Sequence, residues 1–195
     1  FLYFFTLSVI LCSCNGKERM QHTRSTYYWS TTLTLDNVKK QFLSEHNIDR
    51  LYVRYFDVVT DKSGQPMPNA TIHFASKIPK DIEVVPTIYI TNECMTHGIS
   101  DLPEKILGRI LQMNATNGIE NVKEIQIDCD WTLRTQKSYF AFLNCLRHMA
   151  RQKEICLSVT IRLHQLSQTP PPADRGVLMM YNTGDFTDIH CKRPI

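Results

Sequence analysis

The sequence predicts an α/β fold of the (β/α)8 TIM-barrel-like class, with about six strand–helix units in 195 residues. Strands and helices alternate along the chain, which favours a parallel sheet, either doubly wound or closed into a barrel. Two strands carry apolar and polar side chains on opposite faces, whereas a doubly wound sheet buries both faces under helices. A barrel with a polar lumen therefore explains the pattern better. Eight units need about 250 residues, so we expect the C-terminal strands to be missing.

Composition argues against several classes of protein. The chain is 43% hydrophobic and 21% charged, as is usual for a globular domain with one core. A net charge of +3, spread evenly along the chain, argues against a nucleic-acid partner. The seven cysteines form no Cys-x-x-Cys pair, so a zinc site is not expected, and no cofactor is indicated.

The first residues are typical of an export signal. An apolar run over 1–11 is too short to span a membrane and suits the apolar part of a signal peptide. The residues that follow, Leu11-Cys-Ser-Cys14, resemble a bacterial lipobox, in which the last cysteine is acylated after cleavage. The resemblance implies a lipoprotein anchored to a membrane of the bacterial cell envelope. The alternative is an ordinary cleaved signal, with Cys14 an incidental thiol.

Three segments follow from this interpretation. Residues 1–14 are the signal peptide with its lipobox, and residues 15–25 are polar and basic, as expected of a flexible tether. Residues 26–195 hold the partial barrel-like domain. Its first strand is expected over 27–33, where aromatic and β-branched residues gather.

A helix should follow the first strand. Asp36 is placed to cap it, and it should run to about residue 46. Its inner face is expected to consist of Val38, Phe42 and Leu43. A second strand is predicted over 51–58. The stretch 61–79 should be mostly loop, because glycine and prolines interrupt it.

The middle of the chain predicts a third strand over 84–90 and then a helix that begins near Asp101. An acidic cap and a proline in the first turn favour that helix start. After the fourth strand, a helix over 136–151 is expected, with Thr135 as its cap. A fifth strand over 157–163 alternates cleanly, and a sixth is expected over 176–182.

The fourth strand, within 122–131, carries the chemistry. Its apolar face is predicted to hold Ile125, Ile127, Cys129 and Trp131, and its polar face Gln126, Asp128 and Asp130. The two carboxylates should lie roughly 6–7 Å apart along the strand. Carboxylates at the C-terminal end of a strand in a strand–helix unit indicate catalysis or ligand binding.

Two motifs together resemble a known family. Asp128-Cys-Asp-Trp131 resembles the Asp-x-x-Asp-x-Asp-x-Glu strand of chitinase-type (family 18) glycoside hydrolases, and Met179-Met-Tyr-Asn182 resembles that family's Met-x-Tyr-Asp or Met-x-Tyr-Asn strand. Both motifs occur in the family's order and on the expected strands. The chain also resembles a group of bacterial lipoproteins with such a barrel.

The resemblance assigns roles to matching positions. Asp130 matches the residue that orients the substrate's acetamido group, and Asp128 would support it from deeper in the barrel. Tyr181 matches the tyrosine that contacts the reacting group, and Asn182 is its neighbour. Thr132 stands where the family has its catalytic Glu, and a threonine cannot serve as the proton donor. The first motif Asp is also replaced, by an isoleucine. The scaffold is therefore expected without chitinase-type catalysis.

Other polar residues at strand ends are candidates for the same site. Arg162 and His164 end the fifth strand, and Arg54 and Asp57 end the second. Each arginine could pair with a fourth-strand carboxylate and lower its pKa. The alternative is an ion-pair network with only a structural role. Asp128, Asp130 and His164 could hold a divalent metal, but their spacing does not require one, and no metal is predicted.

These observations leave two functions open. The first is a lipid-anchored envelope protein whose barrel binds or processes carbohydrate. The second is a non-enzymatic envelope binding or assembly module, in which the strand carboxylates are structural. A further carboxylate beside Asp130 would favour catalysis, and Asp57, Glu93 and Asp185 are the candidates.

Overall fold

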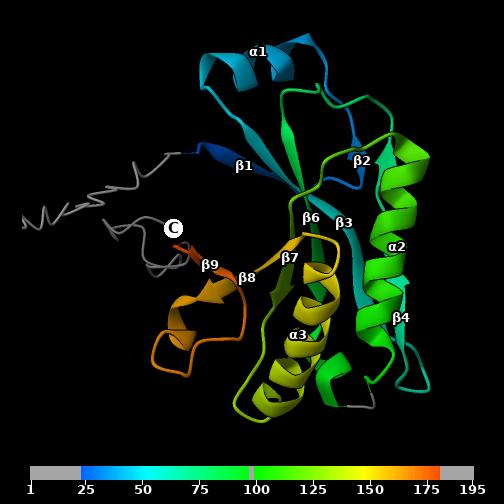
Figure 1. Cartoon of the computed structure of the whole chain (residues 1–195), viewed down its shortest axis with the longest axis vertical. Helices are drawn as coiled ribbons and strands as arrows, with labels where there is room; N and C mark the ends of the chain where they lie inside the picture. The colour runs from blue at the N-terminus through cyan, green and yellow to red at the C-terminus, as the bar shows by residue number, and fades with distance from the viewer. Residues whose placement is uncertain (1–22, 97–98, 181–195) are drawn as a thin grey trace, which may run out of the picture.

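The computed structural model describes residues 23–96 and 99–180 (Figure 1). Its elements in chain order are β1 (Ser25–Tyr28), β2 (Thr32–Leu33), α1 (Asn37–Glu45), β3 (Arg50–Thr60), β4 (Pro66–Asn69), β5 (His73–Phe74), β6 (Glu83–Ile90), the 3-10 turn η1 (Asn92–Thr96), α2 (Leu102–Asn117), β7 (Glu124–Cys129), α3 (Gln136–Arg151), β8 (Cys156–Arg162), the 3-10 turn η2 (Leu163–Gln165) and β9 (Arg175–Met179). The fold is thus mixed α/β, as the sequence predicts.

Six strands form one parallel sheet in the order β1, β3, β6, β7, β8 and β9. This order confirms the six predicted strands and their parallel arrangement. β4 adds to the edge of β3 in the antiparallel direction, and β2 pairs with β5 in a separate small sheet. The strands run away from the α1 end of the molecule, so their C-terminal ends meet at the opposite end (Figure 1).

Side chains that meet across the sheet show that it is curled. The hydroxyl of Tyr27 on β1 donates a hydrogen bond to Oε1 of Gln126 on β7, at 2.9 Å. These strands are three positions apart, which would be about 14 Å in a flat sheet. Only a strongly curved sheet brings the two side chains into contact on one face. The described residues therefore form a half-barrel with a concave inner face.

The helices α2 and α3 cover the outer, convex face of this sheet (Figure 1). Trp131, just after β7, is 1% exposed and stacks on Tyr139 of α3, with ring centroids 6.0 Å apart. Tyr55 of β3 donates a hydrogen bond to Oδ1 of Asn114 on α2, at 2.7 Å. The apolar side of the strands thus faces the helices, as predicted. None of the helices in the described part of the chain is long and apolar enough to cross a membrane.

The first predicted strand is divided in two, because the chain turns after β1. The hydroxyl of Tyr28 donates to the carbonyl of Thr32 and accepts from the amide of Thr34, at 2.9 and 3.0 Å. These bonds hold the turn closed. Residues 61–79 are mostly loop, as predicted, and they also contain the short strands β4 and β5.

All three predicted cap residues occupy the N-cap position of their helix, but only one of them makes a side-chain capping hydrogen bond. Oδ1 of Asp36 accepts a hydrogen bond from the amide of Lys39 at 2.8 Å, as a helix cap should. Asp101 makes no capping bond and pairs with Lys105 at 2.6 Å instead. The hydroxyl of Thr135 donates to Asn92 of η1 at 2.6 Å. The side chain of Thr135 therefore ties the start of α3 to η1, just after the end of β6.

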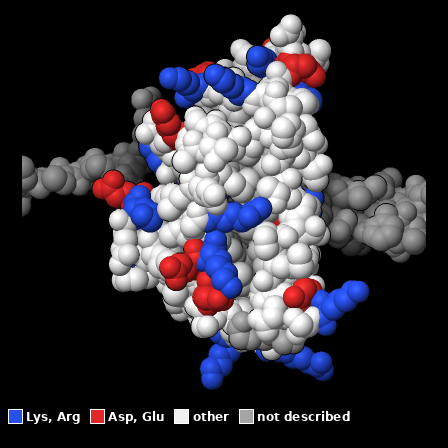
Figure 2. Space-filling model, turned by 90° about the vertical axis from the view of Figure 1, so that its right-hand side faces the viewer, with Lys and Arg blue, Asp and Glu red and all other residues white. Residues whose placement is uncertain are grey.

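The predicted inner face of α1 is wrong in part. Leu43 is buried, but Val38 is 76% exposed and Phe42 is 49% exposed. The reason is the position of α1, which lies at the end of the sheet and does not cover one of its faces (Figure 1). On the side that Figure 2 shows, charges of both signs gather at this upper end.

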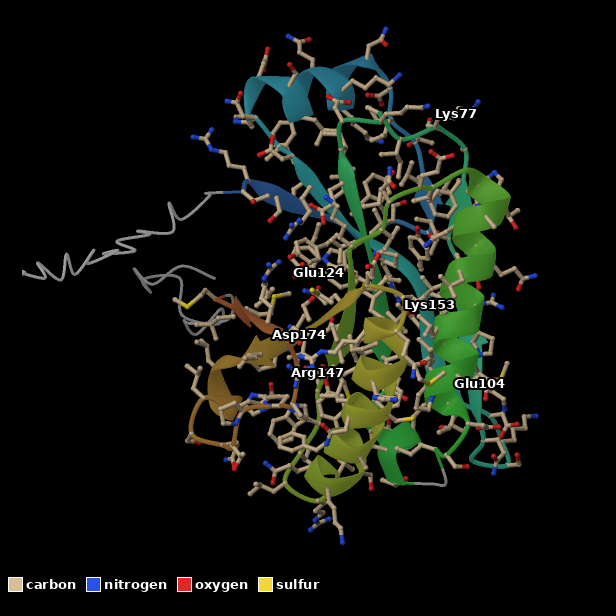
Figure 3. All side chains as sticks on the ribbon, in the orientation of Figure 1. Lys77, Glu104, Glu124, Arg147, Lys153 and Asp174 are labelled. Atoms are coloured by element: carbon tan, nitrogen blue, oxygen red, sulfur yellow. The ribbon has the colours of Figure 1, made fainter. Side chains whose placement is uncertain are left out.

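Two clusters of charged side chains link neighbouring elements, and Figure 3 labels residues of both. Asp174, before β9, accepts hydrogen bonds from Arg147 and Arg151 of α3, both at 2.6 Å, and from the amide of Leu157 at 2.9 Å. Although burial acts in the opposite direction, these bonds lower the pKa of Asp174 to about 2. Glu124, at the start of β7, is described with the inner face below.

Candidate functional site

The strand β7 and the residue that follows it place two carboxylates on the concave face. Asp128 lies within the strand and is 3% exposed, whereas Asp130 follows the strand end and its side chain is 48% exposed. The period-two pattern places Gln126 on the same face, and its contact with β1 identifies that face as the inner one. The sequence prediction for the polar face of this strand is therefore confirmed.

Arg162, at the end of β8, joins the two carboxylates. Its Nε donates to Oδ1 of Asp130 at 2.6 Å, and its Nη2 donates to Oδ1 of Asp128 at 3.0 Å. The hydroxyl of Thr160 also donates to Oδ1 of Asp128, at 2.6 Å. One guanidinium thus spans a buried and a half-exposed carboxylate, leaving the outer side of Asp130 accessible.

Gln165 holds this arginine in place. Its Oε1 accepts a hydrogen bond from the amide of Arg162 at 2.9 Å, and its Nε2 donates to the carbonyl of Trp131 at 3.2 Å. The amide side chain therefore links the end of β8 to the end of β7. His164, the neighbouring residue in η2, is exposed and makes none of these bonds. The structure does not bring His164 into the site.

A second pair, Arg54 and Asp57 on β3, also lies on the inner face. Residues three apart on a regular strand face opposite sides, but a register shift between Arg54 and Phe56 changes that parity. The guanidinium of Arg54 consequently hydrogen-bonds both carboxylate oxygens of Asp57. Asp57 is 6% exposed, so this carboxylate is paired and buried.

Tyr89 on β6 is a site residue that the sequence interpretation missed. It pairs in register with Asp128 on one side and Asp57 on the other, so its side chain shares their face. Burial raises the pKa of Tyr89, and the charges of Asp130 and Asp128 raise it further. The phenol is therefore a hydrogen-bond donor at neutral pH. Its position near the end of the predicted third strand, next to the strand that carries Asp128, could have indicated this role.

The pKa of Asp128 is shifted in the opposite direction to the sequence expectation. Burial raises the pKa of Asp128 above its usual range, although the Thr160 hydrogen bond and the charge of Arg162 act in the opposite direction. Arg54 acts on it in the same direction as Arg162. The expected lowering by a paired arginine is outweighed because Asp128 is removed from water.

Deeper in the concave face lies a charged cluster that the sequence interpretation also missed. Glu124 of β7 is 3% exposed and accepts hydrogen bonds from Arg50 at 3.3 Å, from the hydroxyl of Tyr52 at 3.2 Å and from Arg175. Arg50 also bonds Glu83 at 2.9 Å. This cluster joins β3, β6, β7 and β9 near their first residues and fills the bottom of the half-barrel.

Thr132 lies beyond Asp130, exposed at the same end of the sheet. Its amide donates to the hydroxyl of Thr135 at 3.0 Å, and the two hydroxyls are 3.4 Å apart. Among the possible alternative acids, Asp57 is paired with Arg54, and Glu93 is exposed in η1. Asp185, Tyr181, Asn182 and Cys14 lie outside the described residues.

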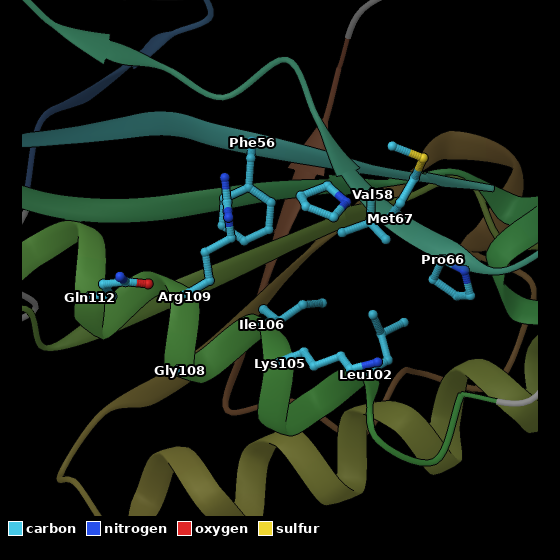
Figure 4. Close-up of a pocket in the computed structure, with 11 residues that line it drawn as sticks. Phe56, Val58, Pro66, Met67, Leu102, Lys105, Ile106, Gly108, Arg109 and Gln112 are labelled. Carbon is cyan, nitrogen blue, oxygen red and sulfur yellow. The ribbon is translucent and has the colours of Figure 1, made fainter. Parts of the chain in front are cut away.

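The described residues contain no group of three or more His, Cys, Asp or Glu side chains that could hold a metal ion. Asp128, Asp130 and His164 therefore do not form such a group. A groove of about 350 Å³ lies elsewhere, between β4 and α2, and is lined by apolar side chains that include Phe56 and Ile106 (Figure 4). It is on the convex side, where Arg109 covers the Phe56 ring at 5.1 Å, and is separate from the carboxylates.

Comparison with known sequences and structures identifies the fold. No known family matches the sequence, and no curated protein matches it. Among solved structures, the spore cortex-lytic enzyme SleL of Bacillus megaterium has a TM-score of 0.56 at 14% identity, over 84% of this chain and 43% of that one.

Two structures named as chitinases are also similar. The chitinase of Chromobacterium violaceum has a TM-score of 0.53 at 11% identity, over 83% of this chain and 56% of that one. A chitinase of Bacteroides thetaiotaomicron has a TM-score of 0.51 at 14% identity, over 85% of this chain and 56% of that one. This chain therefore spans about half the length of these structures. The similarity shows a fold like that of these chitinase and SleL structures, which is the fold that the two sequence motifs predict.

Proposed function

We propose that this protein is a lipid-anchored component of the bacterial cell envelope that binds or processes carbohydrate on its concave face. The observation that carries the proposal is the Asp128–Arg162–Asp130 arrangement at the carboxyl ends of the strands, within a chitinase-like fold. Asp130 is half exposed with a fixed orientation, which suits it to accept hydrogen bonds from a sugar amide or hydroxyl.

Chitinase-type catalysis is not part of the proposal, because Thr132 occupies the position of the acid. Tyr89 adds a neutral hydroxyl donor beside the carboxylates, and such groups bind sugars without cleaving them. The site is therefore proposed to recognise a glycan, with Asp130 as its principal polar contact.

A second function is favoured by one specific observation. Asp128 is buried and both carboxylates already share Arg162, which is what a structural ion-pair network would show. Under this alternative the protein is a non-enzymatic binding or assembly module, and its partner contacts another surface. If Asp130 contacts a glycan, removing its carboxylate lowers the affinity for that glycan, whereas under the structural alternative the affinity does not change.

The Asp130→Ala variant distinguishes these functions. We expect a glycan array with the full-length protein to give at least one hit, and the variant to lose about tenfold to a hundredfold in affinity for it, since a hydrogen bond to a charged group contributes about 1.5–3 kcal/mol. Asp81→Ala, an exposed carboxylate at the other end of the domain, is the matched control and should bind normally. Unchanged affinity in Asp130→Ala would assign both carboxylates to the structural alternative.

Membrane anchoring is proposed through acylation of Cys14. Lipid chains contribute about 0.8 kcal/mol per buried CH₂, so a protein with more than one chain stays on the membrane. In cells, Cys14→Ser should therefore leave the protein without acyl label and in the fraction released from membranes. Cys145→Ser, which changes an exposed thiol of α3, should keep the label. Acyl labelling that persists in Cys14→Ser would contradict the proposal.

A further inference from the structure

The described chain enters the domain beside the helix α1. Nη1 of Arg24 donates a hydrogen bond to the carbonyl of His46, which directly follows α1, at 3.1 Å. The carbonyl of Arg24 accepts from the amide of Asp49 at 2.9 Å. The next residue, Ser25, pairs with Arg50 at the start of β3. The chain that precedes Arg24 therefore joins the domain at the α1 end.

The candidate site lies at the other end of the domain. The strand β3 starts beside Ser25, and its Asp57, which is level with Asp128 in the sheet, lies seven residues after Arg50, or about 23 Å along the strand. Cys14 precedes Arg24 by ten residues, and ten residues span at most about 35 Å when fully extended. A lipid on Cys14 can reach the plane of the site only when about two thirds of this maximum span runs along the strands. The α1 end is the one that the anchor keeps near the membrane.

The exposed face of α1 is apolar at two adjacent positions. Val38 and Phe42 are four residues apart, hence neighbours on the helix surface, and they are 76% and 49% exposed. Leu43 points the other way, into the core. The ring of Phe42 also packs at a tilt against that of His46, with centroids 4.4 Å apart. Apart from this contact with His46, Val38 and Phe42 remain largely exposed in the described part of the chain.

Charges around α1 are nearly balanced. The loop before β6 carries Lys77, which Figure 3 labels, together with Lys80 and Asp81. Asp81 and Lys40 of α1 line a common hollow. Glu45 on α1 adds another negative charge. Anionic lipids therefore attract this end only weakly, and burial of the two apolar side chains is the main favourable contribution.

We propose that α1 docks on the lipid surface, with Val38 and Phe42 at the level of the headgroups and the carboxylate site opening away from the membrane. The inference deepens the proposed function and rests on the anchor at Cys14. The anchor raises the local concentration of α1 at the bilayer, so two apolar side chains are enough to orient the domain. A glycan remote from the membrane would then face Asp130 directly.

Two other arrangements use exposed apolar side chains and give different results. Leu133 and Leu166, at the ends of β7 and β8, are 66% and 59% exposed, and docking through them would turn the site toward the membrane. Alternatively, a second copy of the chain could cover α1. This contact would not need lipid and would depend on protein concentration.

Amide hydrogen exchange on the acylated, full-length protein tests the orientation. The protein is compared in detergent and in vesicles of phosphatidylethanolamine with about one quarter phosphatidylglycerol. We expect exchange in residues 37–46 to slow by about an order of magnitude in vesicles, and exchange in 131–135 and 163–168 to stay unchanged. Protection of the latter two segments in place of α1, or no protection at all, would overturn the proposal.

Substitutions separate docking from anchoring. The double variant Val38→Ser/Phe42→Ser should keep its acyl mass and its co-sedimentation with vesicles, but lose the protection of 37–46. The control variant Leu133→Ser/Leu166→Ser, whose two side chains are similarly exposed, should retain the protection of residues 37–46. Protection that survives in the first variant, or that appears without vesicles at high protein concentration, would refute membrane docking while leaving the anchor intact. A protein without acyl mass would refute both.

Discussion

Replacing Trp131 by alanine is expected to lower the free energy of unfolding by about 3–5 kcal/mol, because truncating a buried large aromatic removes its contacts and leaves a cavity. Trp131 is 1% exposed, stacks on Tyr139 and meets Phe140 edge-on at 5.5 Å. Its carbonyl also accepts the hydrogen bond from Gln165. The midpoint of urea unfolding, followed by far-ultraviolet circular dichroism, measures the loss.

Trp29→Ala is the matched control for this prediction. Trp29 is 39% exposed and stacks on Tyr27 alone, so its truncation should lower the free energy of unfolding by only about 1 kcal/mol. Trp131→Phe should cost less than Trp131→Ala, because it retains a ring and removes a buried Nε1 that has no partner in the described part of the chain. Equal losses in Trp131→Ala and Trp29→Ala would contradict the place of Trp131 in the core.

Elements with strong periodicity were predictable from the sequence. The helix α3 spans Gln136–Arg151, as expected, and the strands β7 and β8 lie where period-two alternation placed them. In these segments the local pattern and the tertiary environment agree, since one face packs on helices and the other lines the concave side. The order of β6, β7 and β8 follows because α2 and α3 each return the chain to the neighbouring parallel position, whereas β3 and β6, and β8 and β9, are joined without an α-helix.

The segment 61–79 is mostly loop, as its glycine and prolines predict, but the short strands β4 and β5 within it were not predicted. In β4, Pro66 and Pro68 alternate at the edge of the sheet, where a strand is paired on one side only. Proline is tolerated at such an edge because its missing N–H can face away from the partner strand. The prediction for α1 is wrong in part because Val38 and Phe42 have the spacing of a core face, whereas the helix packs through Leu43 at the end of the sheet.

The site was predictable where residues follow simple strand parity. Asp128, Asp130 and Arg162 were expected to converge, and they do. The contact between Arg54 and Asp57 depends on the irregularity between Arg54 and Phe56, which no local pattern reveals. The buried cluster of Glu124 was missed because its arginines come from strands two positions away on either side, and only the curvature of the sheet brings them together.

The full-length protein is expected not to hydrolyse N-acetylglucosamine oligomers at a useful rate. In the chitinase-type mechanism an acid beyond Asp130 protonates the glycosidic oxygen, and general acid catalysis contributes about 10²–10⁴-fold. Thr132 stands at that position, and its hydroxyl lies 3.4 Å from that of Thr135, which in turn donates to Asn92. A threonine held in this turn supplies neither the carboxylic acid nor its tuned pKa. Release of reducing sugar from a chitin oligomer measures the rate.

The Thr132→Glu and Thr132→Gln variants test whether the missing acid is the cause. Thr132 is exposed, so either side chain fits without disturbing the core. If the acid alone is lacking, Thr132→Glu should raise the rate above wild type and Thr132→Gln should not, because the two differ only in the ionisable group. Equal, negligible rates in both variants would show that further parts of the catalytic machinery are absent, in keeping with Ile125 at the first motif position. Rapid hydrolysis by the wild-type protein would contradict the prediction and require another acid, for which exposed Glu93 is the first candidate to substitute.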